Sequence, residues 1–99
     1  MPKKSESNLA ISIKCDGVLT RLEKCPVYVI ARYIRRSWVS VNYAAEPYLA
    51  AMATLEDVDS TYGYDSGKSI VAYFLANASS WRGDTARAVK AELRRRIKA

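Results

Sequence analysis

The chain has 99 residues, of which 49% are hydrophobic and 26% charged, and its formal net charge is +6. This length allows one hydrophobic core and is too short for two. The apolar content is that of a globular chain rather than a disordered one. No stretch approaches the roughly 20 consecutive apolar residues that cross a bilayer, so the sequence predicts no membrane-spanning segment.

Composition also argues against catalysis. The chain has no histidine and only two cysteines, Cys15 and Cys25. Without histidine, no Cys–His or Ser–His nucleophile can be assembled within the chain. The spacing of the two cysteines matches no zinc motif. We therefore expect a non-enzymatic binding protein that uses no metal and no cofactor.

The first residues in chain order are polar. Residues 1–8 include Lys3, Lys4 and Glu6, and we expect them to form a disordered basic tail ahead of a single helical domain over residues 9–99. The apolar run behind the tail is too short for a signal peptide. We therefore expect a cytoplasmic protein whose two thiols are reduced.

Residues 9–15 alternate apolar with small or polar side chains, which is typical of a half-buried strand. Asp16-Gly17 follows and is the strongest short-range signal for a hairpin turn. A two-residue turn would place three pairs of residues opposite each other: Cys15 and Val18, Ile13 and Thr20, and Ile11 and Leu22. The alternative is a short helix that begins after Gly17 and ends at Pro26.

From Pro26 onward, apolar residues recur at helical spacing and indicate four amphipathic helices. The expected helix starts are Pro26, Glu46-Pro47, a cap at Asp65 or Ser66, and a cap at Asp84. Gly83 is expected to take the left-handed geometry of a helix end. Short loops favour antiparallel neighbours. The fold class is therefore mainly α: a compact bundle of about four short amphipathic helices, with a small N-terminal β-hairpin as an open addition.

Charge is distributed unevenly along the chain. Residues 1–38 carry eight basic and three acidic groups, residues 39–69 carry one and five, and residues 70–99 carry seven and two. An acidic middle therefore separates two basic ends. Arginines three or four positions apart on a helix project together, and their planar forks match phosphate oxygens.

These arginine-rich faces are the candidate nucleic-acid contacts. The residues concerned are Arg32, Arg35, Arg36, Arg87, Lys90, Arg94, Arg95 and Arg96. The alternative is a solvated face whose cations are favourable at a helix C-terminus without any ligand. Glu92 and Arg96 are also spaced to form a pair one helical turn apart.

Aromatic residues suggest a second surface, for a protein partner with an acidic surface. Tyr, Trp and Arg dominate protein interfaces, and the candidates here are Tyr62, Tyr64, Trp81 and Arg82. The alternative is that the tyrosines are partly buried with hydrated hydroxyls. The sequence leaves open whether the chain forms a homo-oligomer.

Two segments resemble phage tail-completion proteins. The run from Ile11 to Leu22, with Pro26 and an arginine-rich helix behind it, is similar to the opening of those proteins. Val58-Asp59 and residues 66–71 resemble their central segment. The chain turns helical where that family continues in β-strands. The resemblance implies a small virion head–tail joining component. The sequence therefore leaves three functions open: nucleic-acid binding, a protein-binding inhibitor or adaptor that could be phage-encoded, and this virion component.

Overall fold

The computed structural model describes residues 11–98, and within them the fold is mainly helical with a small N-terminal hairpin. This confirms the expected fold class. The elements are β1 (Ser12–Cys15), β2 (Val18–Arg21), the 3₁₀ turn η1 (Leu22–Lys24), α2 (Val27–Ser37), α3 (Glu46–Met52), β3 (Thr61–Tyr62), β4 (Asp65–Ser66), α4 (Gly67–Ala76) and α5 (Asp84–Lys98). The tail expected over residues 1–8 lies outside the described residues.

The N-terminal hairpin has the register expected from its turn. Asp16 has a φ of 54° and Gly17 a φ of 84°, the two left-handed residues of a two-residue hairpin turn. The confirmed pairs are Cys15 with Val18, Ile13 with Thr20, and Ile11 with Leu22, whose N–H donates to the Ile11 carbonyl at 3.0 Å. The alternative helix after Gly17 is wrong for residues 18–21, and between Gly17 and Pro26 only the 3₁₀ turn η1 is helical.

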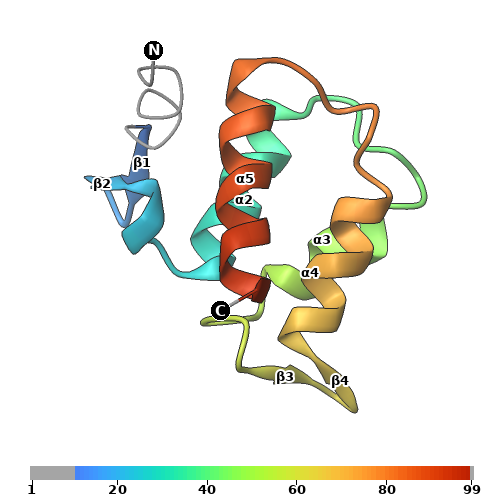
Figure 1. Cartoon of the computed structure of the whole chain (residues 1–99). Coiled ribbons are helices and arrows are strands. Elements are labelled where there is room, and N and C mark those ends of the chain that lie inside the picture. Colours follow the sequence, from blue (N-terminus) through green and yellow to red (C-terminus); the bar gives the residue numbers. More distant parts are fainter. Residues whose placement is uncertain (1–10, 99) are drawn as a thin grey trace.

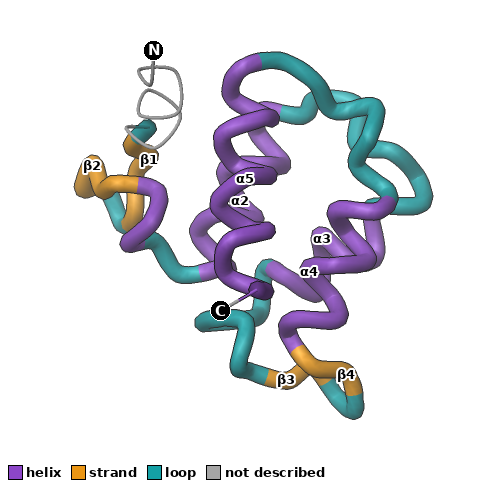
Figure 2. The backbone as a smooth tube through the Cα atoms, in the orientation of Figure 1, coloured by secondary structure: helices purple, strands orange, loops and turns teal. Residues whose placement is uncertain are grey.

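The helices surround one core. Helix α3 packs against both α2 and α4, and α4 packs against α5, as the arrangement in Figures 1 and 2 shows. Phe74 of α4 is fully buried at the centre, and the Trp38 ring that follows α2 meets it edge-on at 6.2 Å between ring centroids. On its other side Trp38 stacks on Trp81 at 5.8 Å. This aromatic column joins the end of α2 to the loop between α4 and α5.

Helix α4 is shorter than the sequence pattern suggests. It begins as expected with Ser66, whose side-chain hydroxyl accepts the Ser69 N–H at 3.1 Å, a standard N-terminal cap. It ends at Ala76, seven residues before Gly83. Gly83 does take a positive φ of 112°, but it directly precedes α5, and its carbonyl accepts the Arg87 N–H at 2.9 Å. Gly83 therefore lies at the start of α5 and is not the residue at which α4 ends.

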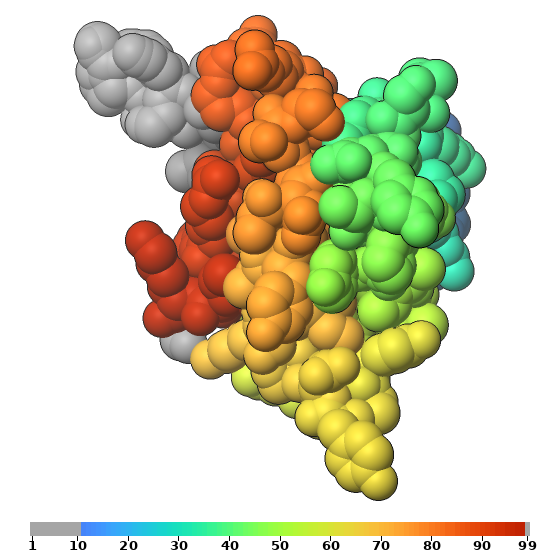
Figure 3. Space-filling view, turned by 90° about the vertical axis from the view of Figure 1, so that its right-hand side faces the viewer, coloured from blue at the N-terminus to red at the C-terminus, as the bar shows by residue number. Residues whose placement is uncertain are grey.

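The β3–β4 hairpin lies at the N-terminal end of α4 and projects from one end of the molecule, in yellow in Figure 3. The loop that precedes β3 contacts the first residue of α4 and fixes the base of the hairpin. The Gly67 N–H donates to the Ser60 carbonyl at 2.7 Å, and a Cβ at Gly67 would lie only 2.8 Å from the Val58 carbonyl oxygen. A glycine at this position lets the two segments approach.

Within residues 11–98, none of the helices combines the length and the apolar character that a membrane crossing requires.

Candidate functional site

The arginines predicted to contact nucleic acid fall into two groups in the structure. Arg96 belongs to the group that holds the fold together. Its side chain is only 12% exposed, and its Nε donates to a Glu92 carboxylate oxygen at 2.7 Å. Its Nη2 donates to the carbonyl oxygens of Leu22 at 3.0 Å and Glu23 at 3.2 Å. Arg96 therefore ties α5 to η1, and its guanidinium group is largely occupied by partners within the protein.

Arg95 is exposed but is held by the same carboxylate. Its Nε and Nη2 donate to the two oxygens of Glu92 at 2.9 and 2.6 Å. Burial of Glu92 acts to raise its pKa, but hydrogen bonds from Arg95 and Arg96 and their positive charges outweigh this and leave the pKa lowered. Glu92 is thus a buried anion whose single negative charge offsets half of the two positive charges of Arg95 and Arg96.

The three arginines of α2 also differ in whether they have an ion-pair partner. Arg35 forms an ion pair with Glu46 at 2.9 Å, which links α2 to α3, and both side chains are 46% exposed. The Arg32 guanidinium lies over the Tyr28 ring, 5.1 Å from its centroid. Arg36 is exposed and has no ion-pair partner within residues 11–98. Arg32 and Arg36 therefore keep their positive charge open to a ligand, whereas much of the charge of Arg35 is satisfied.

The α5 basic surface is formed by Arg82, Arg87, Lys90 and Arg94, which surround a shallow depression of about 270 Å³ beside Trp81. The Lys90 ammonium donates to the Trp81 carbonyl at 2.6 Å. Burial lowers the pKa of Lys90, and the nearby charges of Arg94 and Arg82 lower it further. The cations are thus close enough to repel one another, which concentrates positive potential over this depression.

Acidic groups do little to offset the α5 basic surface. Asp84 pairs with Arg87 at 3.4 Å, but the Asp84 side chain is 97% and the Arg87 side chain 64% exposed, so water and salt screen the pair strongly. Arg82 and Arg94 have no ion-pair partner within the described residues. The surface therefore retains most of its four positive charges.

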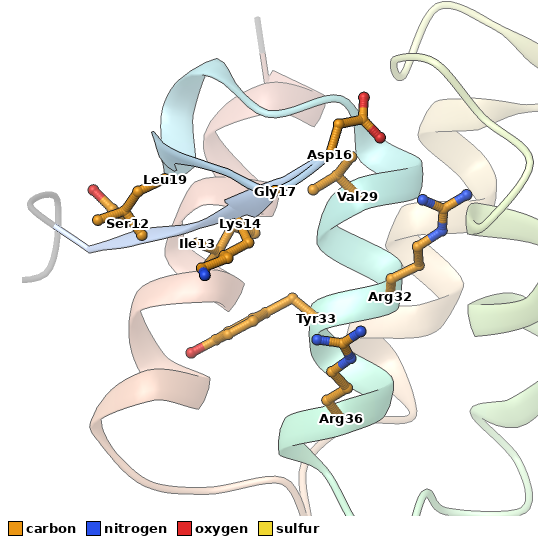
Figure 4. Close-up of a pocket in the computed structure, with 10 residues that line it drawn as sticks. All are labelled: Ser12, Ile13, Lys14, Asp16, Gly17, Leu19, Val29, Arg32, Tyr33 and Arg36. Carbon is orange, nitrogen blue, oxygen red and sulfur yellow. The ribbon is translucent and has the colours of Figure 1, made fainter.

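A second basic feature, the hairpin groove, lies between β1 and α2 and has a volume of about 550 Å³. Figure 4 shows Lys14 extending from β1 toward Tyr33, with Arg32 and Arg36 on α2. Among the described residues, the lining is Ser12, Ile13, Lys14, Asp16, Gly17, Leu19, Val29, Arg32, Tyr33 and Arg36. The groove combines an apolar surface with three cations and shares no lining residue with the α5 basic surface.

The aromatic surface expected from Tyr62, Tyr64, Trp81 and Arg82 does not form. Trp81 is only 5% exposed because it stacks on Trp38. Tyr62 and Tyr64 are exposed, but they precede α4 whereas Trp81 follows it, and a helix of ten residues spans roughly 15 Å. Trp81 is therefore packed in the core and apart from the two tyrosines, and Arg82 lies with the α5 basic surface.

Lys14 is the basic residue that sequence reasoning missed. It lies on β1 next to the buried Ile13, and its exposed side chain lines the groove opposite α2. The alternation of β1 already placed Lys14 on the solvent side. Lys14 and Arg32 line the same groove because the hairpin packs against α2. The sequence pattern of one strand cannot predict that packing.

The described part of the chain contains no group of three or more His, Cys, Asp or Glu side chains that could hold a metal ion. Comparison with known proteins adds no assignment, since no family model, no curated protein and no solved structure matches the chain.

Proposed function

We propose that this protein binds the phosphate backbone of nucleic acid through the α5 basic surface. The observation that carries the proposal is the convergence of four cations, Arg82, Arg87, Lys90 and Arg94, on one shallow depression. Backbone phosphates are spaced closely enough for several to be neutralised by such a cluster. Arginine guanidinium groups suit this role because they donate to phosphate oxygens in pairs.

The binding is expected to depend weakly on nucleotide sequence. The four cations come from one side of α5 and from the loop before it, and the depression that they surround is shallow and open. Contacts of this kind orient a protein on the duplex, whereas sequence is read from base edges in the grooves. The proposed activity is therefore a general one, suited to an accessory protein.

The test is fluorescence anisotropy with two short DNA duplexes of unrelated sequence, titrated between 50 and 200 mM salt. Four phosphate contacts correspond to a slope of log K against log salt of about −3.6, so affinity should fall about 100-fold over that range. Both duplexes should bind with similar affinity. A flat salt response would contradict the proposal.

The double substitution Arg87→Gln with Arg94→Gln locates the site. Both side chains are exposed, so the fold should tolerate glutamine, and the salt slope should become shallower by about one for each phosphate that is no longer neutralised. The matched control is Arg32→Gln with Arg36→Gln, which removes the same charge from α2. If the control weakens duplex binding and the α5 variant does not, the α5 basic surface is not the nucleic-acid site.

A further inference from the structure

We propose that the hairpin groove binds an extended acidic peptide segment of a partner protein, which adds to β1 as a third strand. This site is separate from the α5 basic surface and does not depend on the proposed function. Three features support the proposal: the edge of β1, the apolar lining of the groove, and its cations.

The first feature is the free edge of β1, meaning the edge that pairs with no other strand within residues 11–98. Leu22 bonds to Ile11, and with the observed register this makes Ile11, Ile13 and Cys15 the residues of the first strand that bond to the second. In an antiparallel pair the intervening residues point their main-chain groups outward. Ser12 and Lys14 therefore direct N–H and C=O groups away from β2, and neither makes a main-chain hydrogen bond to any other part of residues 11–98.

The free edge borders the groove. Ser12, Ile13 and Lys14 are consecutive and all three line it, opposite residues of α2. A groove that met only one face of the strand would contact alternate residues. The lining of three successive residues therefore places the main chain of β1 along the groove, where an incoming strand could pair with it.

The second feature is the apolar part of the lining. Leu19 is 67% exposed, and it lines the groove together with Val29 and Tyr33. Neighbouring Val18 is 65% exposed. Leu19 pairs with Lys14 across the hairpin, so the two side chains lie on one face of it. A peptide in strand conformation presents alternate side chains to opposite sides, so apolar residues at every second position could cover Leu19.

The third feature is charge. Arg32 and Arg36 line the groove from α2 and Lys14 lines it from β1, and within residues 11–98 Asp16 is the only acidic side chain in the lining. Glutamate or aspartate at the intervening positions of the peptide could pair with Arg32 and Arg36. The protein's own residues 1–8 are a poor match, because they carry two lysines and one glutamate.

The probe is a labelled short peptide that alternates glutamate and valine, and binding is followed by anisotropy with the full-length protein. The double variant Arg32→Gln with Arg36→Gln should weaken binding by about tenfold or more, since it removes two of the three cations that line the groove. The matched control Arg87→Gln with Arg94→Gln should change the dissociation constant by less than about twofold. Equal losses in both variants would indicate general charge attraction and overturn the proposal.

Two further peptides test the chemistry. A version N-methylated at alternate residues keeps the charge but blocks main-chain pairing, and it should lose about tenfold in affinity. A version with lysine in place of glutamate should not bind. If the methylated peptide binds as well as the parent, strand addition is refuted. If an unrelated DNA duplex displaces the parent peptide and loses its own binding in the α2 variant, the groove is a nucleic-acid site and the peptide proposal fails.

Discussion

The buried carboxylate of Glu92 is the ionic group on which the packing of α5 against the N-terminal hairpin depends most directly. Its side chain is 2% exposed and accepts hydrogen bonds from Arg95 and Arg96, while Arg96 reaches the carbonyls of Leu22 and Glu23 on η1. The substitution Glu92→Gln conserves shape and removes the charge. The remaining amide oxygen can still accept one hydrogen bond from each guanidinium group, as Oε2 does now. The amide NH₂ group replaces the oxygen that accepts from Arg95 Nε and therefore faces a donor, and the negative charge between the two arginines is lost.

The cost follows from the exposure of the two arginines. Arg95 is 57% exposed and can be solvated once it is released, but Arg96 is 12% exposed and would keep a buried charge without its anion. Removing one partner of a buried ion pair typically costs about 3–5 kcal/mol. Because only Arg96 stays buried, we expect a loss of about 3 kcal/mol in the free energy of unfolding, which corresponds to a fall in Tm of about 12–24 °C.

Acid should reproduce the effect of the substitution. The pKa of Glu92 is lowered in the folded protein, so its carboxylate stabilises the fold above the pKa that it has in the unfolded chain. That contribution is lost as the pH falls through the lowered folded-state pKa. The difference in stability between the wild type and Glu92→Gln should therefore shrink as the pH is reduced from about 7 toward about 2.

Urea denaturation followed by circular dichroism at several pH values measures both effects. The matched control is Glu46→Gln, which breaks the exposed pair with Arg35 and should cost less than about 1 kcal/mol. A loss below about 1 kcal/mol in Glu92→Gln, or a difference from wild type that does not change with pH, would refute the reasoning.

Three further outcomes are expected. Trp81→Ala should cost about 3–5 kcal/mol in urea denaturation because the ring is buried against Trp38, whereas the fully exposed Tyr64→Ala should stay within about 0.5 kcal/mol of wild type. Gly67→Ala should cost about 1–3 kcal/mol by the same measurement, because its Cβ would lie 2.8 Å from a loop carbonyl oxygen; an unchanged midpoint would contradict that close approach. In iodoacetamide labelling followed by mass spectrometry, the buried Cys25 thiol should react more slowly than the half-buried Cys15 thiol, since burial raises the pKa of Cys25. Equal rates would show that the structure around Cys25 opens readily.

The local elements could be predicted because their causes are local. Asp16-Gly17 determines the N-terminal turn and, through it, the register of every pair in the hairpin. The four helices follow from apolar spacing, and Ser66 begins α4 through its own side chain. The error at the end of α4 has a different origin. Ala78 stands four positions after Phe74, which is helical spacing, and it is buried although it lies outside α4. Apolar spacing alone therefore does not show that the helix ends at Ala76.

The sequence by itself determined the fold class, the positions of the helices and the excess of positive charge at both ends. It also indicated that Glu92 and Arg96 are spaced to pair. Only the tertiary structure decided which cations remain available, because Arg96 finds its carbonyl partners 73 and 74 residues away along the chain. The burial of Trp81 and the approach of Lys14 to α2 were decided in the same way. A pattern within one helix or strand indicates which face is buried, but which distant group a side chain meets is decided by packing between segments far apart in the chain.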